Sequence, residues 1–178
     1  MIIERFLNAA LFFAEKTAAF DTIKLYKLLF LADRDCMKKT GHTITEATYR
    51  KIQPWGPVPV EAKALVDGMA AGDEITPPLS GYLKVKKKGN KTDINLSGAA
   101  DLNYFSGEEV AILEKLAEKY KHYSGKNIAH AVHNMRGVKE LDWGKDFHME
   151  VFLPAKDREA SREARAVAHR FKLSLMHG

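Results

Sequence analysis

Cys36 is the single cysteine of this chain and the first candidate for nucleophilic chemistry. A reactive cysteine is a thiolate, which an exposed electropositive setting or a neighbouring histidine stabilises. Seven histidines are present, but the sequence places none of them beside Cys36. Cys36 falls on the apolar face of a predicted helix, where a free cysteine behaves as a small hydrophobic residue. The sequence therefore favours a core role over a Cys-His nucleophile.

A pair of histidines offers a second kind of chemistry, metal binding. His130 and His133 are three residues apart in one predicted helix, so they share a face and could hold zinc. A zinc site needs further ligands, and Glu140, Asp142 and His148 could be recruited only by assumption. The sequence favours one packed and one exposed histidine, with no metal and no cofactor.

Motifs for other kinds of catalysis are absent from the sequence. Gly56 lies in Pro-Trp-Gly-Pro-Val-Pro, which lacks the longer loop and the Lys-Ser or Lys-Thr ending of a phosphate cradle. There is no dinucleotide-binding fingerprint, nucleophile elbow or zinc-protease motif. Asp33 and Asp35 are two residues apart on a helix and point in different directions, so they cannot act as an acid–base couple. We therefore expect a protein that is not an enzyme.

The positive charge of the chain admits nucleic acid as a partner without requiring it. The net charge is +5, with an isoelectric point near 9.2. Lysines gather between residues 84 and 91, where they could also protect strand edges. In the tail, Glu159 and Glu163 interrupt an arginine stripe, which favours a solvated helix face over phosphate binding. The stripe consists of Arg158, Arg162, Arg165 and Arg170.

The elements that position these residues form a mainly α fold with a small β-hairpin. Apolar spacing predicts helices over residues 3–19, 22–40, 60–69, 106–120 and 124–135, with hairpin strands over 82–86 and 92–96. Asp21 or Thr22 can cap the second helix, and Gly41 can end it. After Gly41, residues 42–56 are predicted as extended chain with a short strand at 43–45. Pro57 and Pro59 are predicted to form a stiff loop before the next helix.

We expect one compact helical domain over residues 1–178, with an amphipathic C-terminal helix over about 157–176. A single cysteine excludes an intramolecular disulfide and is typical of a reducing compartment. No apolar run reaches transmembrane length, and the N-terminus resembles an amphipathic helix rather than a signal peptide. The expected location is the cytoplasm, without membrane contact.

A series of short motifs resembles the Panacea domain, the SocA-like antitoxin family that is often labelled phage-associated. The series begins with Lys24-Leu25-x-Lys27-Leu28-Leu29-Phe30 and Ala32-Asp33-Arg34. It continues with Thr40-Gly41-x-x-Ile44-Thr45 and Gly56-Pro57-Val58-Pro59, then with Phe105-Ser106, Ile128, His133 and Trp143. The resemblance extends from about Phe20 to Trp143, and Glu46 stands where the family often has glycine.

The resemblance implies a helical protein that neutralises a cognate toxin encoded beside it by direct protein contact. At least one relative resembles a proteolytic adaptor, which adds a protease as a possible partner. The alternative is a nucleic-acid-binding regulator of a phage or toxin–antitoxin operon. The resemblance implies no catalytic residues, in agreement with the motif search.

Our hypothesis for the partner-binding residues centres on the second helix and the rigid loop that follows it. Rigid elements suit recognition because they lose little entropy on binding. They equally suit structural roles, since Lys24 could pair with a carboxylate and the prolines could simply anchor the chain. The proposed contact residues are Lys24, Lys27, Arg34, Trp55, Gly56, Pro57 and Val58. The family-motif residues expected to be structural are Gly41, Ile44, Thr45, His133 and Trp143.

Overall fold

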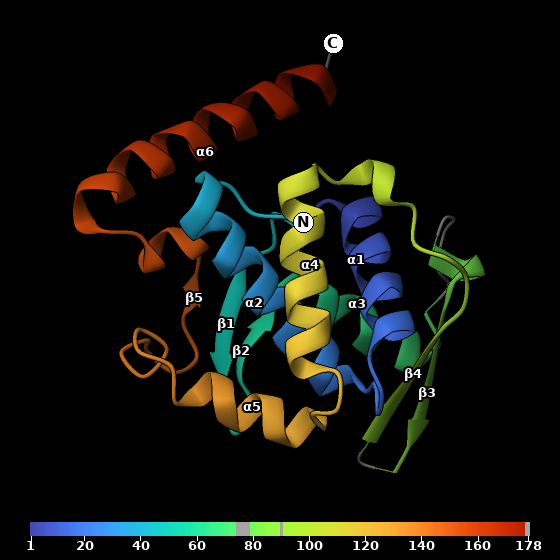
Figure 1. Ribbon diagram of the computed structural model, residues 1–178. Helices are drawn as coiled ribbons and strands as arrows, with labels where there is room; N and C mark the ends of the chain where they lie inside the picture. Colours follow the sequence, from blue (N-terminus) through green and yellow to red (C-terminus); the bar gives the residue numbers. More distant parts are fainter. Residues whose placement is uncertain (74–78, 90, 177–178) are drawn as a thin grey trace.

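The computed structural model describes residues 1–73, 79–89 and 91–176 and shows the mainly α fold that the sequence predicts (Figure 1). The helices within these residues are α1 (Ile3–Lys16), α2 (Thr22–Thr40), α3 (Val60–Ala71), α4 (Gly107–Tyr120), α5 (Gly125–His133) and α6 (Ala155–Met176). The strands are β1 (Tyr49–Ile52), β2 (Gly56–Pro59), β3 (Leu83–Lys88), β4 (Lys91–Leu96) and β5 (Asp146–Phe147). Short 3-10 turns precede β3, α4 and α6, at Leu79–Gly81 (η1), Leu102–Tyr104 (η2) and Met149–Phe152 (η3).

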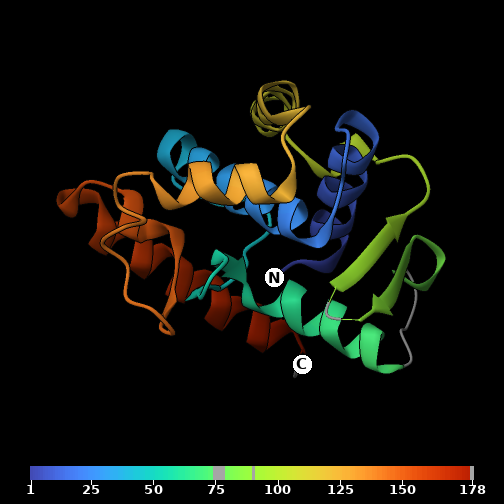
Figure 2. The same ribbon diagram turned by 90° about the horizontal axis from the view of Figure 1, so that it is seen from below.

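Helix α2 lies at the centre of the fold, where it contacts α1, α4, α5 and β2 (Figure 2). Its sequence is apolar on several sides, and Leu25, Leu28 and Phe30 are completely buried. The Asp21 side chain accepts a hydrogen bond from the Lys24 backbone N–H and caps the first turn. Gly41 ends the helix with a left-handed φ of 81°. Both helix boundaries confirm the sequence prediction.

A small antiparallel sheet of order β2-β1-β5 packs against α2, and the sequence prediction of this region was wrong. The strand lies at Tyr49–Ile52 rather than at residues 43–45, and Gly56–Pro59 is strand β2 rather than a loop. Both prolines are tolerated because β2 is an edge strand, which does not need every backbone donor. Tyr49 of β1 is paired with Phe147 of β5 and is fully buried.

The β3–β4 hairpin confirms the second β prediction and lies on the other side of the helical body from β1 and β5 (Figure 1). Gly89 in its turn has a φ of 61°, whereas Asn90 lies outside the described residues. A two-stranded hairpin is unstable alone, and this one contacts α1, α2 and α3. Thr22 also donates its hydroxyl to the backbone oxygen of Thr92 at 2.6 Å.

Helix α6 lies along the outside of the molecule after η3 (Figure 1). Arg158 donates to the backbone oxygen of Leu153, and Arg165 forms an ion pair with buried Glu150. These two contacts attach α6 to the body. Arg162 and Arg165 remain exposed, as the sequence predicts for this helix face, whereas Arg158 is half-buried. No helix in the described ranges has the length and apolar character needed to span a membrane.

The loop from α2 to β1 is organised around the buried carboxylate of Asp33. Asp33 accepts hydrogen bonds from the Thr45 backbone N–H at 2.8 Å, from the Thr45 hydroxyl and from the Tyr49 hydroxyl at 2.7 Å. Burial raises the pKa of Asp33, and the hydrogen bonds from Thr45 and Tyr49 oppose that increase. Glu46, which directly follows Thr45, adopts a left-handed φ of 54°. This conformation favours the glycine often found there in the family.

We expect Asp33→Ala to lower the free energy of unfolding by about 3 kcal/mol, because it leaves three buried donors without an acceptor. Asp35→Ala is the matched control two residues away on α2, since Asp35 pairs with adjacent Arg34 near the surface. The control should cost less than about 1 kcal/mol. Urea unfolding of both variants measures the difference, and equal losses would contradict a specific role for the Asp33 network.

Candidate functional site

Two exposed tryptophans adjoin His133, one in the turn between β1 and β2 and the other beside Lys51 of β1. Trp55, in the turn between β1 and β2, is 44% exposed, and Trp143, in the segment before β5, is 46% exposed. Both neighbour the imidazole of His133 at the end of α5, Trp143 through its ring and Trp55 through its backbone. We call Trp55, His133 and Trp143 the tryptophan surface. Large exposed aromatic side chains of this kind are enriched at the energetic centres of protein interfaces.

Trp143 is fixed in place by Lys51 of β1. The Lys51 ammonium lies 4.4 Å from the centre of the Trp143 ring, in a cation–π contact. It also donates to the backbone oxygens of Lys139 at 3.2 Å and Leu141 at 2.7 Å. The backbone N–H of Gly144 returns a bond to the Lys51 oxygen at 2.8 Å. Segment 139–144 is therefore attached to β1 both before and after Trp143 in the chain.

Trp55 is positioned by Gly56 and by Lys27 of α2. Gly56 has a left-handed φ of 77°, and a Cβ atom there would lie 2.3 Å from Nε2 of His133. Only glycine therefore lets the turn approach the imidazole so closely. The buried ammonium of Lys27 donates to the backbone oxygen of Pro57 and holds the turn from the inside.

His133 contacts both tryptophans. Its ring meets that of Trp143 edge to face, with centroids 6.0 Å apart. Burial lowers the pKa of His133, the positive charges of Lys27 and Lys51 lower it further, and a hydrogen bond to the Trp55 backbone opposes them. Its buried Nε2 has no hydrogen-bond partner among the described residues. His133 and Trp143 lie beside β1 and β2.

The buried lysines of α2 act on backbone rather than at the surface. Lys24 and Lys27 are both 0% exposed, so neither ammonium is presented to a partner in this structure. Lys24 donates to the oxygens of Ala18 at 2.6 Å and Lys121 at 3.1 Å, in place of the carboxylate considered from the sequence. Burial lowers the pKa of Lys24, and it lowers the pKa of Lys27 to about 7.

The other proposed contact residues divide between the surface and its support. Gly56, Pro57 and Val58 are buried in β2, and Arg34 is half-buried beside Asp35. Among the seven proposed contact residues, Trp55 is therefore the most exposed, and its contact with a partner stays a prediction. The expected structural residues Ile44 and Thr45 are indeed buried, whereas Trp143 is exposed. Its place beside short polar residues, without apolar periodicity, is the signal that could have identified it.

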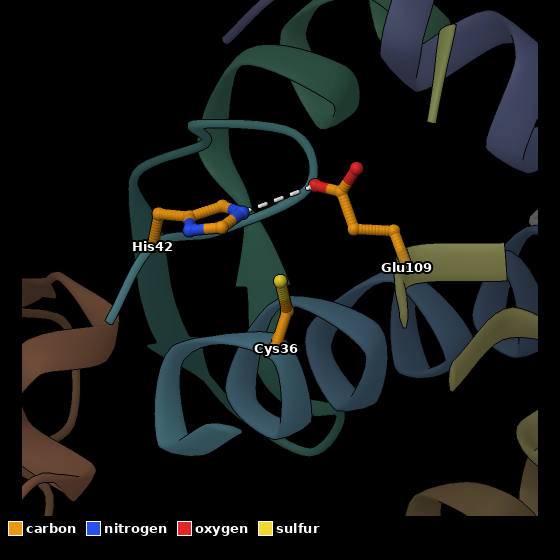
Figure 3. A group of neighbouring side chains, drawn as sticks. All are labelled: Cys36, His42 and Glu109. Atoms are coloured by element: carbon orange, nitrogen blue, oxygen red, sulfur yellow. Dashed lines mark ion pairs between the residues drawn. The ribbon is translucent and has the colours of Figure 1, made fainter. Parts of the chain in front are cut away.

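A second cluster of chemically capable side chains lies at the opposite end of α2. Cys36, His42 and Glu109 place one potential ligand atom each within 4.8 Å of one another. Figure 3 shows the His42 imidazole and the Glu109 carboxylate joined by an ion pair, with the Cys36 thiol below them. Cys36 is completely buried, as predicted, but the sequence did not place His42 beside it. In the part of the chain that the structure describes, His130 and His133 belong to no such group.

We expect Gly56→Ala to disturb the tryptophan surface, because the added methyl group collides with His133. Gly41→Ala is the matched control: its φ of 81° carries the same backbone cost of about 1–2 kcal/mol, but nothing lies within 4 Å of the new methyl group. Gly56→Ala should cost about 1–3 kcal/mol more than this control in urea unfolding. Adding His133→Ala to Gly56→Ala should recover part of that excess, and no recovery would contradict the steric explanation.

We expect stability to rise with pH above about 7 because of Lys27. The pKa of Lys27 in the folded state is about 7, below the ordinary lysine value of 10.5, so between these two values the unfolded state binds more protons. One such proton adds up to about 1.4 kcal/mol per pH unit to the free energy of unfolding. In Lys27→Met, the free energy of unfolding should rise less steeply with pH between pH 7 and 9.5 than in the wild type. In the control Lys39→Met, which replaces an exposed lysine, it should rise as steeply as in the wild type. Identical slopes in all three proteins would show that Lys27 titrates normally.

Comparison with known proteins gives the family of the chain. No curated protein and no solved structure matches it. The family model described as "Antitoxin SocA-like, Panacea domain" matches residues 25–137, which is more than half of the chain. The matched range includes α2 from Leu25 onward, β1, β2 and α5, and hence Trp55 and His133, whereas Trp143 lies just beyond it. The chain belongs to the SocA-like antitoxin family with a Panacea domain.

Proposed function

We propose that this protein is a non-enzymatic antitoxin that neutralises its toxin by direct binding, with Trp55 and Trp143 at the centre of the contact. The family membership carries the proposal of an antitoxin. The exposure of both tryptophans on a rigidly supported surface carries the proposal of where the toxin binds. The toxin is produced in the same cell, so this function places the antitoxin in the cytoplasm.

The physical argument for this surface is preorganisation. The Trp55 turn is held by Lys27 and Gly56, and the Trp143 segment is held by Lys51, so binding needs little further ordering of backbone. Each tryptophan contributes a large apolar area with few rotatable bonds. A surface of this kind can bind a folded protein without the entropy cost of arranging a flexible loop.

The surroundings of Trp143 resemble the rim of an interface. Asp142 and Lys145 form an exposed ion pair, and Arg50 pairs with Asp146 on the neighbouring strands. A shallow pocket lined by residues 140–142 and 145–147 lies next to Trp143 in the chain. Exposed charges at a rim contribute more to partner choice and association rate than to affinity. We therefore propose that the tryptophans provide the affinity and that this charged rim selects the toxin.

Delivery of the toxin to a protease is a further step that such binding allows. The same contact would hold the toxin while another face of the antitoxin meets the protease. Toxin half-life in cells with and without the antitoxin tests this step separately, since an adaptor shortens the half-life and a simple inhibitor does not.

We expect Trp55→Ala and Trp143→Ala each to weaken toxin binding by roughly 30-fold or more, the effect of removing an interface residue worth about 2 kcal/mol. Tyr104→Ala is the matched control, because Tyr104 is also exposed (43%) but lies in η2, away from this surface (Figure 1). The measurements are growth rescue on coexpression with the product of the adjacent gene, and calorimetric titration of the purified pair.

The outcomes separate the function from its surface. If the wild-type protein neither rescues growth nor binds the adjacent gene product, the antitoxin proposal for this pair is wrong. If the wild-type protein binds and both tryptophan variants bind equally well, the antitoxin function stands and the proposed surface is wrong. Far-UV circular dichroism of each variant shows whether the fold is retained.

A further inference from the structure

The Cys36, His42 and Glu109 cluster joins three separate parts of the chain. Cys36 lies in the last turns of α2, His42 follows the Gly41 cap, and Glu109 lies in the first turn of α4. Their ligand atoms are within 4.8 Å of one another, and the three side chains converge on one region in Figure 3. Cys36 and Glu109 are buried, whereas the His42 side chain is 58% exposed, so an ion could reach the cluster from solvent.

The ligand types suit zinc, and so does the distance between the imidazole and the carboxylate. Thiolate sulfur, imidazole nitrogen and carboxylate oxygen are the ligands that Zn²⁺ uses in proteins. Two tetrahedral N and O ligands at about 2.1 Å from zinc lie about 3.4 Å apart. The observed distance between Nε2 of His42 and Oε1 of Glu109 is 3.4 Å. Hard cations such as Mg²⁺ and Ca²⁺ prefer oxygen ligands throughout, so sulfur and nitrogen favour a transition metal or zinc.

We propose that Cys36, His42 and Glu109 form a Zn²⁺ site with three protein ligands and a water molecule in the fourth position. Binding forms a bond between zinc and the Cys36 sulfur, and the thiol proton leaves to solvent. This inference is independent of the toxin contact, because the cluster and the tryptophan surface share no residue.

Arg5 is the main opposing charge and also orients the carboxylate. Its guanidinium forms an ion pair with Oε1 of Glu109 and donates to the backbone oxygens of Ile44 at 2.6 Å and Tyr104 at 2.9 Å. The other carboxylate oxygen accepts the Ser106 backbone N–H at 2.8 Å. A carboxylate oxygen has a second lone pair, so Oε1 can bind both Arg5 and the metal. Arg5 lowers the affinity through its charge but holds the ligand in place, as outer partners of metal ligands do.

The remaining neighbours are compatible with a metal. The Thr40 hydroxyl lies 3.3 Å from the Cys36 sulfur and donates to the Cys36 backbone oxygen. Exposed Lys39 is already paired with Glu108. Burial raises the pKa of the metal-free Cys36 thiol to about 11, so the thiol is neutral until a metal displaces its proton. A bound ion would connect the end of α2, the following loop and the start of α4.

The test is cobalt and zinc titration of the tag-free, chelator-treated full chain. We expect one Co²⁺ per chain, with a thiolate-to-cobalt charge-transfer band that Zn²⁺ abolishes by competition. His42→Ala and Cys36→Ser should each lower the affinity by at least about tenfold. His122→Ala is the matched control, because His122 is also exposed but lies beyond the other end of α4.

His42→Ala keeps the test decisive even if Cys36→Ser folds poorly, since His42 is on the surface. Loss of the charge-transfer band in His42→Ala but not in His122→Ala supports the site. A micromolar titration without a charge-transfer band would overturn the proposal. Binding that His42→Ala and Cys36→Ser leave unchanged would overturn it as well. The same concentration of Zn²⁺ should also raise the melting temperature of the wild type and of the His122→Ala variant, and should raise that of His42→Ala less.

Discussion

The structure depends on the burial of three charged side chains along one helix. Lys24, Lys27 and Asp33 of α2 are each 0% exposed in the centre of the molecule. A buried charge is costly unless polar partners surround it, so each of these groups requires a particular piece of chain beside it. Lys24 donates to backbone oxygens just after α1 and α4, and Lys27 donates to one in β2. Asp33 accepts hydrogen bonds from the loop before β1. The central helix thereby fixes the position of most segments that contact it.

This constraint links the family motif of α2 to the surface of the molecule. Lys27 holds the backbone of Pro57, which sets the turn carrying Trp55. Gly56 in that turn lies against His133, whose ring supports Trp143. The motif lysine and the two tryptophans are therefore connected by a short series of packed contacts. The residues resembling the family in α2 can therefore position the tryptophan surface, which is our proposed toxin contact, without being exposed themselves.

The sequence predicted the helices well, because apolar spacing and capping residues are local signals. Asp21, Gly41 and the Ser106–Glu109 capping box all lie where the structure shows helix ends. The β1–β2–β5 sheet was not predicted, since β2 is rich in proline and β5 pairs with a strand almost one hundred residues earlier. Local pattern cannot indicate such a pairing.

The candidate sites were harder to predict from the sequence for the same reason. Lysines three apart on a helix suggest an exposed pair, and only the packing around α2 shows that Lys24 and Lys27 are inside. Likewise, Cys36 and His42 are separated by the end of a helix, and Glu109 comes from a distant one. Their proximity follows from the left-handed turn at Gly41 and from the contact of α4 with α2.

Lys27 determines where the Trp55 turn lies but contributes little to the stability of the fold. A buried ammonium without a carboxylate partner is a weak source of stability, and an apolar side chain of similar length can match or exceed it. An apolar side chain cannot donate to the Pro57 oxygen, however, and so cannot determine where the Trp55 turn lies. The contribution of Lys27 is therefore positional: its desolvation is tolerated because the single hydrogen bond selects one arrangement of the turn. The toxin contact that we propose for Trp55 depends on this arrangement of the turn rather than on the stability that Lys27 adds.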